Sequence, residues 1–384
     1  MRRKGIRTWL FVLVGMTLCL PLLAEKRYAL LIASGEFAPN TTFHEKPLKA
    51  PQNDVRLLAS LLTWRFGFTP SSVTLIGVPT QSMGKDFRYA SSHASFVAIE
   101  QAFQALKRMV KPEDVVVVYY SGHGTRILDP TAKQLGYQYE ALVTYEATQA
   151  TLIRDVLLRS WLSSLRSKRV CMVLDTCYAA GASRDISPDT WEGLTFNYVS
   201  KGVSGKNLTG GGASPSVPDV ATDTEPPYMV LAACGRREKA QELRLLPIEG
   251  RSEIAVSAFT LALCRTLFWE RGELTYTQLL ERVQAKLKQL RLPQKPEVLG
   301  AQAGQVALAP QMWRGGAPRF PLARKEPPLL NVGILAGVRS TMRFDEMGAG
   351  GSQMEAVNPD WFTAELKLLN GKSVQSAFVV LAHE

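Results

Sequence analysis

The stretch that decides the fold is 115–124, VVVVYYSGHG, together with its later counterpart 170–181, VCMVLDTCYAAG. Both runs are apolar and rich in β-branched residues, and each breaks into small residues next to a reactive side chain, His123 or Cys177. A run without polar alternation is typical of a strand buried on both faces of a parallel sheet, although a buried helical segment has a similar pattern. The short length and the Gly-His-Gly ending favour strands. Because the carboxyl ends of parallel strands meet at one edge, His123 and Cys177 can share one crevice.

The remaining periodicity predicts alternating strands and helices. Apolar runs indicate strands at 27–34, 73–76, 115–120, 170–174 and 228–233, and spacings of three and four indicate helices at 52–64, 95–110, 152–165, 254–269 and 276–290. Such alternation is typical of βαβ units with right-handed crossovers. The predicted fold class is therefore α/β, with a mostly parallel sheet flanked by helices.

Changes in composition divide the chain. Residues 25–310 form the predicted main domain, within which 182–227 is rich in Gly, Ser, Pro, Asp and Thr and is expected to be a mobile linker loop. Residues 311–325, rich in Pro and Arg, are expected to be a linker. Residues 326–384 are predicted to be a small β-rich region, with Asn370-Gly371 as a type I′ hairpin turn.

The first 24 residues have a basic start, an apolar core and a small residue at Ala24, which is the pattern of a secretory signal peptide. We therefore expect an exported protein, periplasmic or secreted; an uncleaved membrane tether is the alternative, since Leu22 does not fit the usual cleavage pattern. Removal of this segment leaves 41 basic and 34 acidic residues, so the net charge falls from +11 to about +7. No dense basic run interleaves with aromatic residues, which argues against nucleic-acid binding.

The four cysteines after this segment are Cys171, Cys177, Cys234 and Cys264. Export favours disulfides. Cys171 and Cys177 lie along one strand and are about 20 Å apart at strand rise, too far to bridge. A Cys177–Cys234 disulfide stays open at this point. A buried structural thiol is expected at Cys264.

His123 and Cys177 together suit nucleophilic catalysis. A thiolate is the working nucleophile, and a neighbouring imidazole can take its proton and later protonate a leaving amine. Asp175 lies two residues before Cys177 and shares its face of the strand. A carboxylate there raises the pKa of the thiol unless a cationic substrate group neutralises it, which suggests a pocket for Lys or Arg. Capping of a turn by Asp175 is the alternative.

Several motifs, in order, resemble one known family. YYSGHG and DTCYAAG follow ALLIAS and PQND, and EALVTYEA, YMVLAACGRREKAQE, SAFTLALCRTL, GELTYTQLLERV and LPQKPEVLG complete the series. Over residues 26–300 the chain resembles caspase-like cysteine peptidases, nearer to bacterial metacaspase-like members than to animal caspases. The resemblance implies a cysteine endopeptidase of caspase-like fold that cleaves protein or peptide substrates after basic residues.

The resemblance also assigns roles to single residues. Cys177 matches the nucleophile and His123 the general base and acid, while the backbone N–H groups of Gly124 and Cys177 match the oxyanion hole. Asp175 and Asp54 match acids of the basic-residue pocket. Glu146 is a third candidate, for which a solvated loop acid is the alternative. No cofactor is implied; calcium activates some relatives, but no carboxylate cluster has calcium-loop spacing.

The chain departs from the family pattern after the nucleophile. Where the family commonly has Asp-Ser-Cys-His-Ser-Gly, this sequence has Thr176, Tyr178, Ala179 and Ala180 at four of the six places. A catalytically inactive caspase-like binding or scaffold protein is therefore the alternative function. A thiol redox protein is a weaker one, because no C-x-x-C motif is present.

The linker loop offers basic residues to such a pocket. Arg184, Lys201 and Lys206 lie in 182–227, where family members often carry a cleavable linker. Self-cleavage in this loop is the corresponding hypothesis. The sequence predicts no particular oligomeric state.

Overall fold

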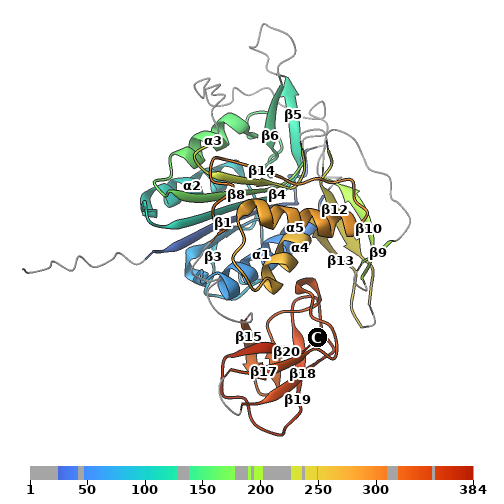
Figure 1. The fold of residues 1–384 in the computed structure, drawn as a ribbon. Helices are drawn as coiled ribbons and strands as arrows, with labels where there is room; N and C mark the ends of the chain where they lie inside the picture. The colour runs from blue at the N-terminus through green and yellow to red at the C-terminus, as the bar shows by residue number, and fades with distance from the viewer. Residues whose placement is uncertain are drawn as a thin grey trace, which may run out of the picture.

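A seven-stranded sheet forms the centre of the molecule (Figure 1). The computed structural model describes residues 25–41, 47–128, 138–177, 189–191, 194–201, 226–235, 238–248, 250–308, 319–347 and 351–383. The strand order is β14-β11-β8-β4-β1-β2-β3, and only β14 runs antiparallel to its neighbour. The strands are β1 (Arg27–Ser34), β2 (Val73–Ile76), β3 (Arg88–Ser91), β4 (Val115–Gly122), β8 (Arg169–Asp175), β11 (Met229–Ala232) and β14 (Glu297–Leu299). This mostly parallel sheet confirms the predicted fold class.

Helices cover both faces of the sheet. They are α1 (Ala50–Arg65), α2 (Phe96–Met109), α3 (Asp155–Ser163), α4 (Ala258–Trp269) and α5 (Tyr276–Gln289). Helices α1, α4 and α5 lie on one face, and α2 and α3 lie on the other (Figure 1). Strand β4 serves both cores, because Val117 and Tyr119 pack on the first face and Val116 and Val118 on the second. This double burial explains the absence of polar alternation in the sequence.

The carboxyl ends of β4 and β8 lie side by side. The two strands pair in parallel, with Ser121 opposite Asp175. On the other side of β4, Ser34 at the end of β1 is opposite Gly122. The residues that follow these strand ends therefore leave the sheet at one place.

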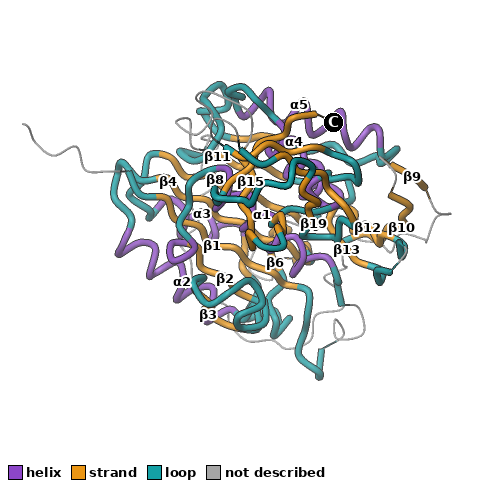
Figure 2. Tube along the Cα trace, turned by 90° about the horizontal axis from the view of Figure 1, so that it is seen from below, coloured by secondary structure: helices purple, strands orange, loops and turns teal. Residues whose placement is uncertain are grey.

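Two short sheets stand beside this edge. Strands β5 (Gly124–Leu128), β6 (Gln138–Leu142) and β7 (Ile153–Arg154) form one of them. The other has the antiparallel order β13-β12-β10-β9 and lies at one end of the molecule (Figure 2). Its strands are β9 (Asp189–Trp191), β10 (Leu194–Ser200), β12 (Gln241–Leu245) and β13 (Ile254–Ser257).

This second sheet corrects two sequence predictions. The expectation of a loop throughout 182–227 is wrong for β9 and β10, because Leu194 and Phe196 are buried on alternate positions and β10 pairs with β12. The predicted helix at 254–269 begins only at Ala258, since 254–257 pair with β12 as a strand. Both errors come from pairing partners distant in sequence. The rest of 182–227, apart from Lys201 and residues 226–227, lies outside the described residues.

The C-terminal residues form a closed six-stranded barrel of order β15-β16-β19-β18-β17-β20, which contacts α1 and α4 (Figure 1). Its strands are β15 (Arg319–Lys325), β16 (Pro328–Leu330), β17 (Arg343–Glu346), β18 (Gln353–Val357), β19 (Ala364–Leu368) and β20 (Phe378–His383), and a short 3₁₀ helix, η4 (Ile334–Ala336), interrupts the series. The expected linker at 311–325 is wrong for 319–325, which form β15.

The predicted hairpin at Asn370-Gly371 is also wrong. Strand β19 pairs with β16 and β18, whereas β20 pairs with β15 and β17. Gly371 does adopt the left-handed conformation of a turn residue, with φ of 68°. Barrel closure, however, separates the two strands that the turn was expected to join.

Among the described residues, no helix has the length and apolar character that crossing a bilayer requires. The predicted signal segment, residues 1–24, lies outside the described part of the chain.

A substitution of Gly122 tests the packing at the end of β4. A Cβ atom there would lie 2.6 Å from the Tyr120 hydroxyl and 2.8 Å from the Ser34 carbonyl oxygen. We expect Gly122→Ala to lower the free energy of unfolding by about 1–3 kcal/mol, because the surrounding backbone cannot give way. The measurement is urea unfolding followed by circular dichroism.

The matched control is Gly304→Ala, since nothing lies within 4 Å of a Cβ at that position. Equal stabilities of the two variants would contradict the steric argument.

Candidate active site

His123 and Cys177 follow the adjacent ends of β4 and β8. Each lies two residues beyond the opposed pair Ser121 and Asp175. Neighbouring strands are about 4.8 Å apart, so this register brings the two backbones together. Both side chains are buried: His123 is 3% exposed and Cys177 is 0% exposed. The register thus places the two residues at neighbouring strand ends, and a contact between their side chains stays a prediction.

The imidazole of His123 is held by contacts on several sides. Its Nδ1 lies 2.5 Å from the carbonyl oxygen of Lys201, and its ring stacks on Phe37 with centroids 5.6 Å apart. A carbonyl oxygen only accepts, so Nδ1 carries the proton in this arrangement and, in the neutral ring, Nε2 keeps a lone pair. The Tyr120 hydroxyl lies 2.8 Å from the His123 carbonyl oxygen, and burial raises the pKa of Tyr120, which keeps it a donor.

Asp175 is completely buried and hydrogen-bonded through both carboxylate oxygens. Its Oδ1 accepts from Lys201 Nζ at 2.8 Å and from the Ser257 hydroxyl at 2.7 Å. Its Oδ2 accepts from the Thr260 hydroxyl at 2.5 Å and lies 3.4 Å from that of Tyr119. These four partners come from three separate segments of the chain, so Asp175 does not merely cap a local turn.

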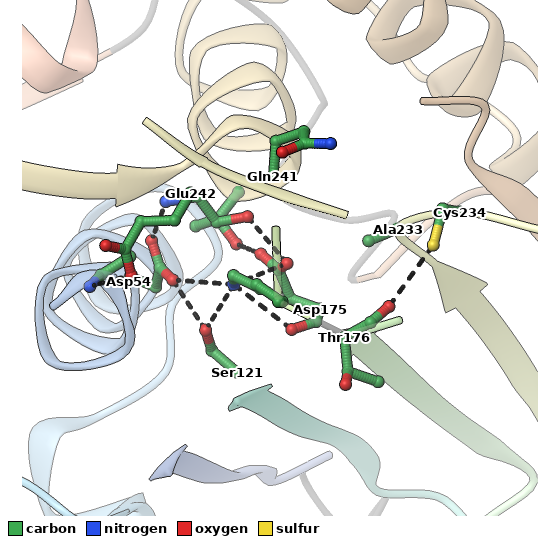
Figure 3. A network of polar contacts seen from close by, with 12 residues as sticks. Asp54, Ser121, Asp175, Thr176, Ala233, Cys234, Gln241 and Glu242 are labelled. Atoms are coloured by element: carbon green, nitrogen blue, oxygen red, sulfur yellow. Dashed lines mark hydrogen bonds and ion pairs between the residues drawn. The ribbon is translucent and has the colours of Figure 1, made fainter. Parts of the chain in front are cut away.

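Asp54, on α1, faces the same point from the opposite side (Figure 3). Its Oδ2 accepts from the Ser121 hydroxyl at 2.7 Å, and its Oδ1 accepts from the Ser257 backbone N–H at 2.7 Å. Burial raises the pKa of Asp54 to about 7, and nearby Asp175 adds to that rise although Lys201 opposes it. The structure thus brings together the two acids that the family resemblance assigned to one pocket.

Lys201 fills the space between these acids. Its side chain is 0% exposed, and its Nζ lies 2.8 Å from Asp175 Oδ1, 3.5 Å from Asp54 Oδ2 and 2.9 Å from Ser121 Oγ. Burial opposes the positive charge, but Asp175 and Asp54 outweigh it, so the pKa of Lys201 is raised. Sequence reasoning named Lys201 as a cleavage candidate and missed it as the occupant of the acidic pair. The site formed by the carboxylates of Asp54 and Asp175, which Lys201 occupies, is called the acidic pocket.

Glu242 was also missed by sequence reasoning. It is fully buried on β12, and its Oε2 accepts from the backbone N–H groups of Lys49 and Ala50 at 2.9 and 2.8 Å. These groups begin α1, where an anion compensates the exposed N–H groups and the helix dipole. Glu242 therefore helps to fix the helix that carries Asp54. Its sequence, an acid on an alternating strand, gives no signal of this role.

Glu146, the third acid that the sequence suggested for the pocket, lies at the start of α2 instead. Its Oε2 accepts from the backbone N–H of Phe96 at 3.1 Å, at the start of α2. No contact between Glu146 and the acidic pocket is found in the described part of the chain, and we leave it out of that pocket. Gly124, the first residue of β5, pairs with Leu142, so its role in an oxyanion hole stays a prediction.

The four cysteines in the described part of the chain form no disulfide. The Cys177–Cys234 bridge left open by the sequence is thus absent, and the Cys234 thiol instead donates to the Thr176 carbonyl oxygen at 3.6 Å (Figure 3). Burial raises the pKa of Cys171 to about 12 and also raises that of Cys264, as expected of structural thiols. Within the described residues, no three His, Cys, Asp or Glu side chains are grouped to hold a metal ion.

A cavity of about 580 Å³ lies elsewhere, between α4, α5 and the barrel. Arg265, Trp269, Lys286 and Arg339 contribute to its lining, whereas His123, Cys177 and the acidic pocket do not. The chemistry of the candidate site is therefore separate from this cavity.

Comparison with known proteins shows the family of this chain. A family model described as the caspase domain matches residues 26–306, so the chain belongs to the caspase domain family of cysteine peptidases. Metacaspase-7 of Arabidopsis thaliana is 27% identical over 165 residues, which cover 41% of this chain and 36% of that protein. The chain thus matches only about a third of the length of this curated relative.

Solved structures have low sequence identity to the chain. Protein GSU0716 from Geobacter sulfurreducens is 16% identical with a TM-score of 0.46, over 71% of this chain and 92% of that one. Caspase-1 from Spodoptera frugiperda is 14% identical with a TM-score of 0.38, over 71% and 86%.

Removal of the Lys201 charge tests the acidic pocket thermodynamically. In a Cys177→Ala background, we expect Lys201→Met to lower the free energy of unfolding by about 3–5 kcal/mol at pH 8, because two buried carboxylates lose their cation. The loss should be smaller at pH 5.5. The pKa of Asp54 is raised in the folded state, so its protonated form is favoured there below about 7 and one negative charge disappears.

The measurement is urea unfolding at both pH values. A Lys49→Met variant is the control, since that side chain is 61% exposed and should change stability little at either pH. A pH-independent loss in Lys201→Met would contradict the assigned electrostatics.

Proposed function

We propose that this protein is a cysteine endopeptidase that cleaves peptide bonds after Lys or Arg with His123 and Cys177 as its catalytic dyad. The observation that carries the proposal is the position of Lys201. Its ammonium lies between two buried carboxylates while its carbonyl oxygen lies 2.5 Å from His123 Nδ1. The side chain of one basic residue thus reaches the two acids while its carbonyl group reaches His123, which supports a cleavage point after a basic residue.

The dyad supplies the nucleophile. His123 takes the Cys177 thiol proton, and the thiolate attacks the carbonyl carbon to form a tetrahedral intermediate. His123 then gives its proton to the leaving amine as the C–N bond breaks. A thioester with Cys177 remains, and water activated by His123 hydrolyses it to release the carboxylate product.

The oxyanion of the intermediate needs donors. The backbone N–H groups of Gly124 and Cys177 are the proposed ones, since both follow the ends of the paired strands β4 and β8. Such donors stabilise charge that develops only in the transition state, which is why they accelerate the chemical step.

Selectivity comes from the acidic pocket. Ammonium and guanidinium groups neutralise Asp54 and Asp175, whereas an Asp side chain would add a third negative charge in a buried site. The same cation offsets the effect of Asp175 on the thiol pKa. Protein or peptide substrates with basic residues are therefore the proposed partners.

We also propose that the protein is exported, because residues 1–24 have the pattern of a secretory signal peptide.

A second proposal is that the chain cleaves itself after Lys201. The bond that follows is Lys201–Gly202. Of the three basic residues considered in the loop, Lys201 lies within the described residues, and its side chain lies between the two acids. While Lys201 is bound there, an external basic residue must displace it, so the cut would free the pocket for other substrates.

Peptide hydrolysis tests the first proposal. We expect purified residues 25–384 to release the fluorophore from peptides ending in Arg or Lys and not from those ending in Asp, with and without calcium. Cys177→Ala should abolish the release, and Asp175→Asn should raise KM for basic peptides by about 10-fold or more, because a buried cation loses its main counter-ion. Initial rates across substrate concentration measure both effects.

Other outcomes have definite meanings. Cleavage after Asp by the wild-type protein would keep the peptidase and discard the role of Asp175. A folded wild-type protein that cleaves nothing, and whose Cys177 resists labelling by peptide chloromethyl ketones, would favour the binding or scaffold alternative.

Intact-mass analysis tests the second proposal. On incubation, the wild-type chain should yield a fragment ending at Lys201, and both Cys177→Ala and Lys201→Met should prevent that cut. Lys201→Arg should retain it, since the pocket then still receives a cation.

Lys206→Met is the matched control and should be cut after Lys201 like the wild type. A single intact species after prolonged incubation of a protein that cleaves peptides would refute self-cleavage.

A further inference from the structure

The barrel rests on the elements that build the acidic pocket. Asp54 is carried by α1, and Asp175 is bonded by Thr260 of α4 and by Ser257, which ends β13 and directly precedes α4. None of these residues is close in sequence to the barrel, which begins at β15. The C-terminal region nevertheless contacts α1, α4 and the segment leading into β13.

Helix α4 is attached to the barrel at its far end. Arg265 Nε donates to the Leu335 carbonyl oxygen at 3.1 Å and its guanidinium donates to that of Ile334 at 2.8 Å. Trp269 Nε1 donates to the Ala336 carbonyl oxygen at 2.5 Å. The three carbonyls are those of η4, so two side chains bind the whole 3₁₀ turn.

The distance from these anchors to the pocket is short. Thr260 and Arg265 are five residues apart on one helix, about 7.5 Å along its axis. Eleven of the twelve residues of α4 are buried, so most of the helix lies within the core, and its Arg265 and Trp269 also line the cavity of about 580 Å³. A shift of one end is therefore transmitted to the other, where the Thr260 hydroxyl bonds Asp175.

Helix α1 meets the barrel as well. The Arg56 guanidinium, two residues after Asp54, lies 3.8 Å from the ring centroid of Phe362. Leu57, Ser60, Val332 and Trp361 line a gap of only about 10 Å³ between the two parts. A gap of this size barely holds one water molecule, so the packing is close at this point. A wider cavity of about 430 Å³ lies beside it, lined in part by Arg56, Ser60 and Phe362.

The start of β13 provides a third attachment. Trp361 Nε1 donates to the Ser252 carbonyl oxygen at 3.1 Å, and Arg251 lies 3.7 Å from Asp360. Ser252 lies two residues before β13, whose last residue is Ser257. The loop at 360–362 and η4 thus contact α1, α4 and the segment before β13. These elements carry Asp54, Thr260 and Ser257.

We propose that the C-terminal barrel is a brace for the acidic pocket, with Arg265 and Trp269 as positioning residues. They touch no substrate; they hold α4 so that Ser257 and Thr260 keep the Asp175 carboxylate oriented toward a bound cation. This inference rests on the proposed function in one respect, namely that the bound cation is the basic side chain of a substrate.

Lys201 provides a readout that does not need catalysis. In a Cys177→Ala background, Lys201 is sheltered in the pocket, and its rate of acetylation by an N-hydroxysuccinimide ester measures how often the pocket opens. We expect Arg265→Lys and Trp269→Phe to raise this rate about tenfold each, because the helix loses its fixed hydrogen bonds to η4. Peptide mass spectrometry quantifies the modification.

Three controls accompany the measurement. Lys49, with a side chain 61% exposed, reports the activity of the reagent and should not change. Leu369→Ser alters a barrel residue that is 42% exposed and should leave Lys201 protected. Alkylation of Cys171, buried on β8, reports general loosening of the core.

The outcomes separate the possibilities. An unchanged acetylation rate of Lys201 in Arg265→Lys, in Trp269→Phe and in the double variant would overturn the proposal that the barrel positions the pocket. An equal rise at Lys201 and Cys171 would also overturn it, since the barrel would then stabilise the domain in general.

Kinetics give a second readout in the active protein. There Arg265→Lys and Trp269→Phe should raise KM for Arg peptides with little change in kcat. A wild-type protein that cleaves no peptide would refute the proposed function, and the acetylation result would still decide this inference.

Discussion

The buried charge cluster of Lys201, Asp54 and Asp175 is the constraint on which the rest of the structure depends. Two carboxylates without solvent destabilise a fold unless a cation and hydrogen-bond donors compensate them. Here Ser121, Ser257 and Thr260 supply donors, and Lys201 supplies the charge. These residues come from β4, the β13–α4 junction, α4 and the end of β10, so the cluster joins the central sheet to the second sheet and to the helices.

The parallel register of β4 and β8 is the second constraint. Because Ser121 is opposite Asp175, the residues two positions further on, His123 and Cys177, leave the sheet together. The glycine at 122 is part of this arrangement, since Tyr120 and Ser34 occupy the space of a side chain there. Pairing of two strand ends therefore places an imidazole, a thiol and a carboxylate at one edge of the sheet, where Lys201 contacts Asp175 and His123.

The C-terminal barrel contacts the elements that carry the residues of the acidic pocket. Its buried residues share one hydrophobic core with α1 and α4. Its polar and ring contacts reach Arg265 of α4, Arg56 of α1 and Ser252 before β13, on the elements that carry Thr260, Asp54 and Ser257. A pocket built from side chains of four segments is sensitive to small displacements of any of them. The hydrogen bonds and ring contacts between the barrel and the two helices are expected to limit those displacements.

The sequence by itself determined the buried strands, the main helices, the α/β class and the candidate dyad, because apolar periodicity and small residues beside His123 and Cys177 are local signals. It did not determine that β10 and β13 are strands, that residues 319–325 enter a barrel, or that Glu242 caps α1. These features depend on partners far away in sequence, as β10 needs β12 and the Lys49–Ala50 amides need an acid from β12. Only the tertiary structure decided that Lys201 occupies the acidic pocket, because the value of a buried charge is set by the carboxylates that surround it in space.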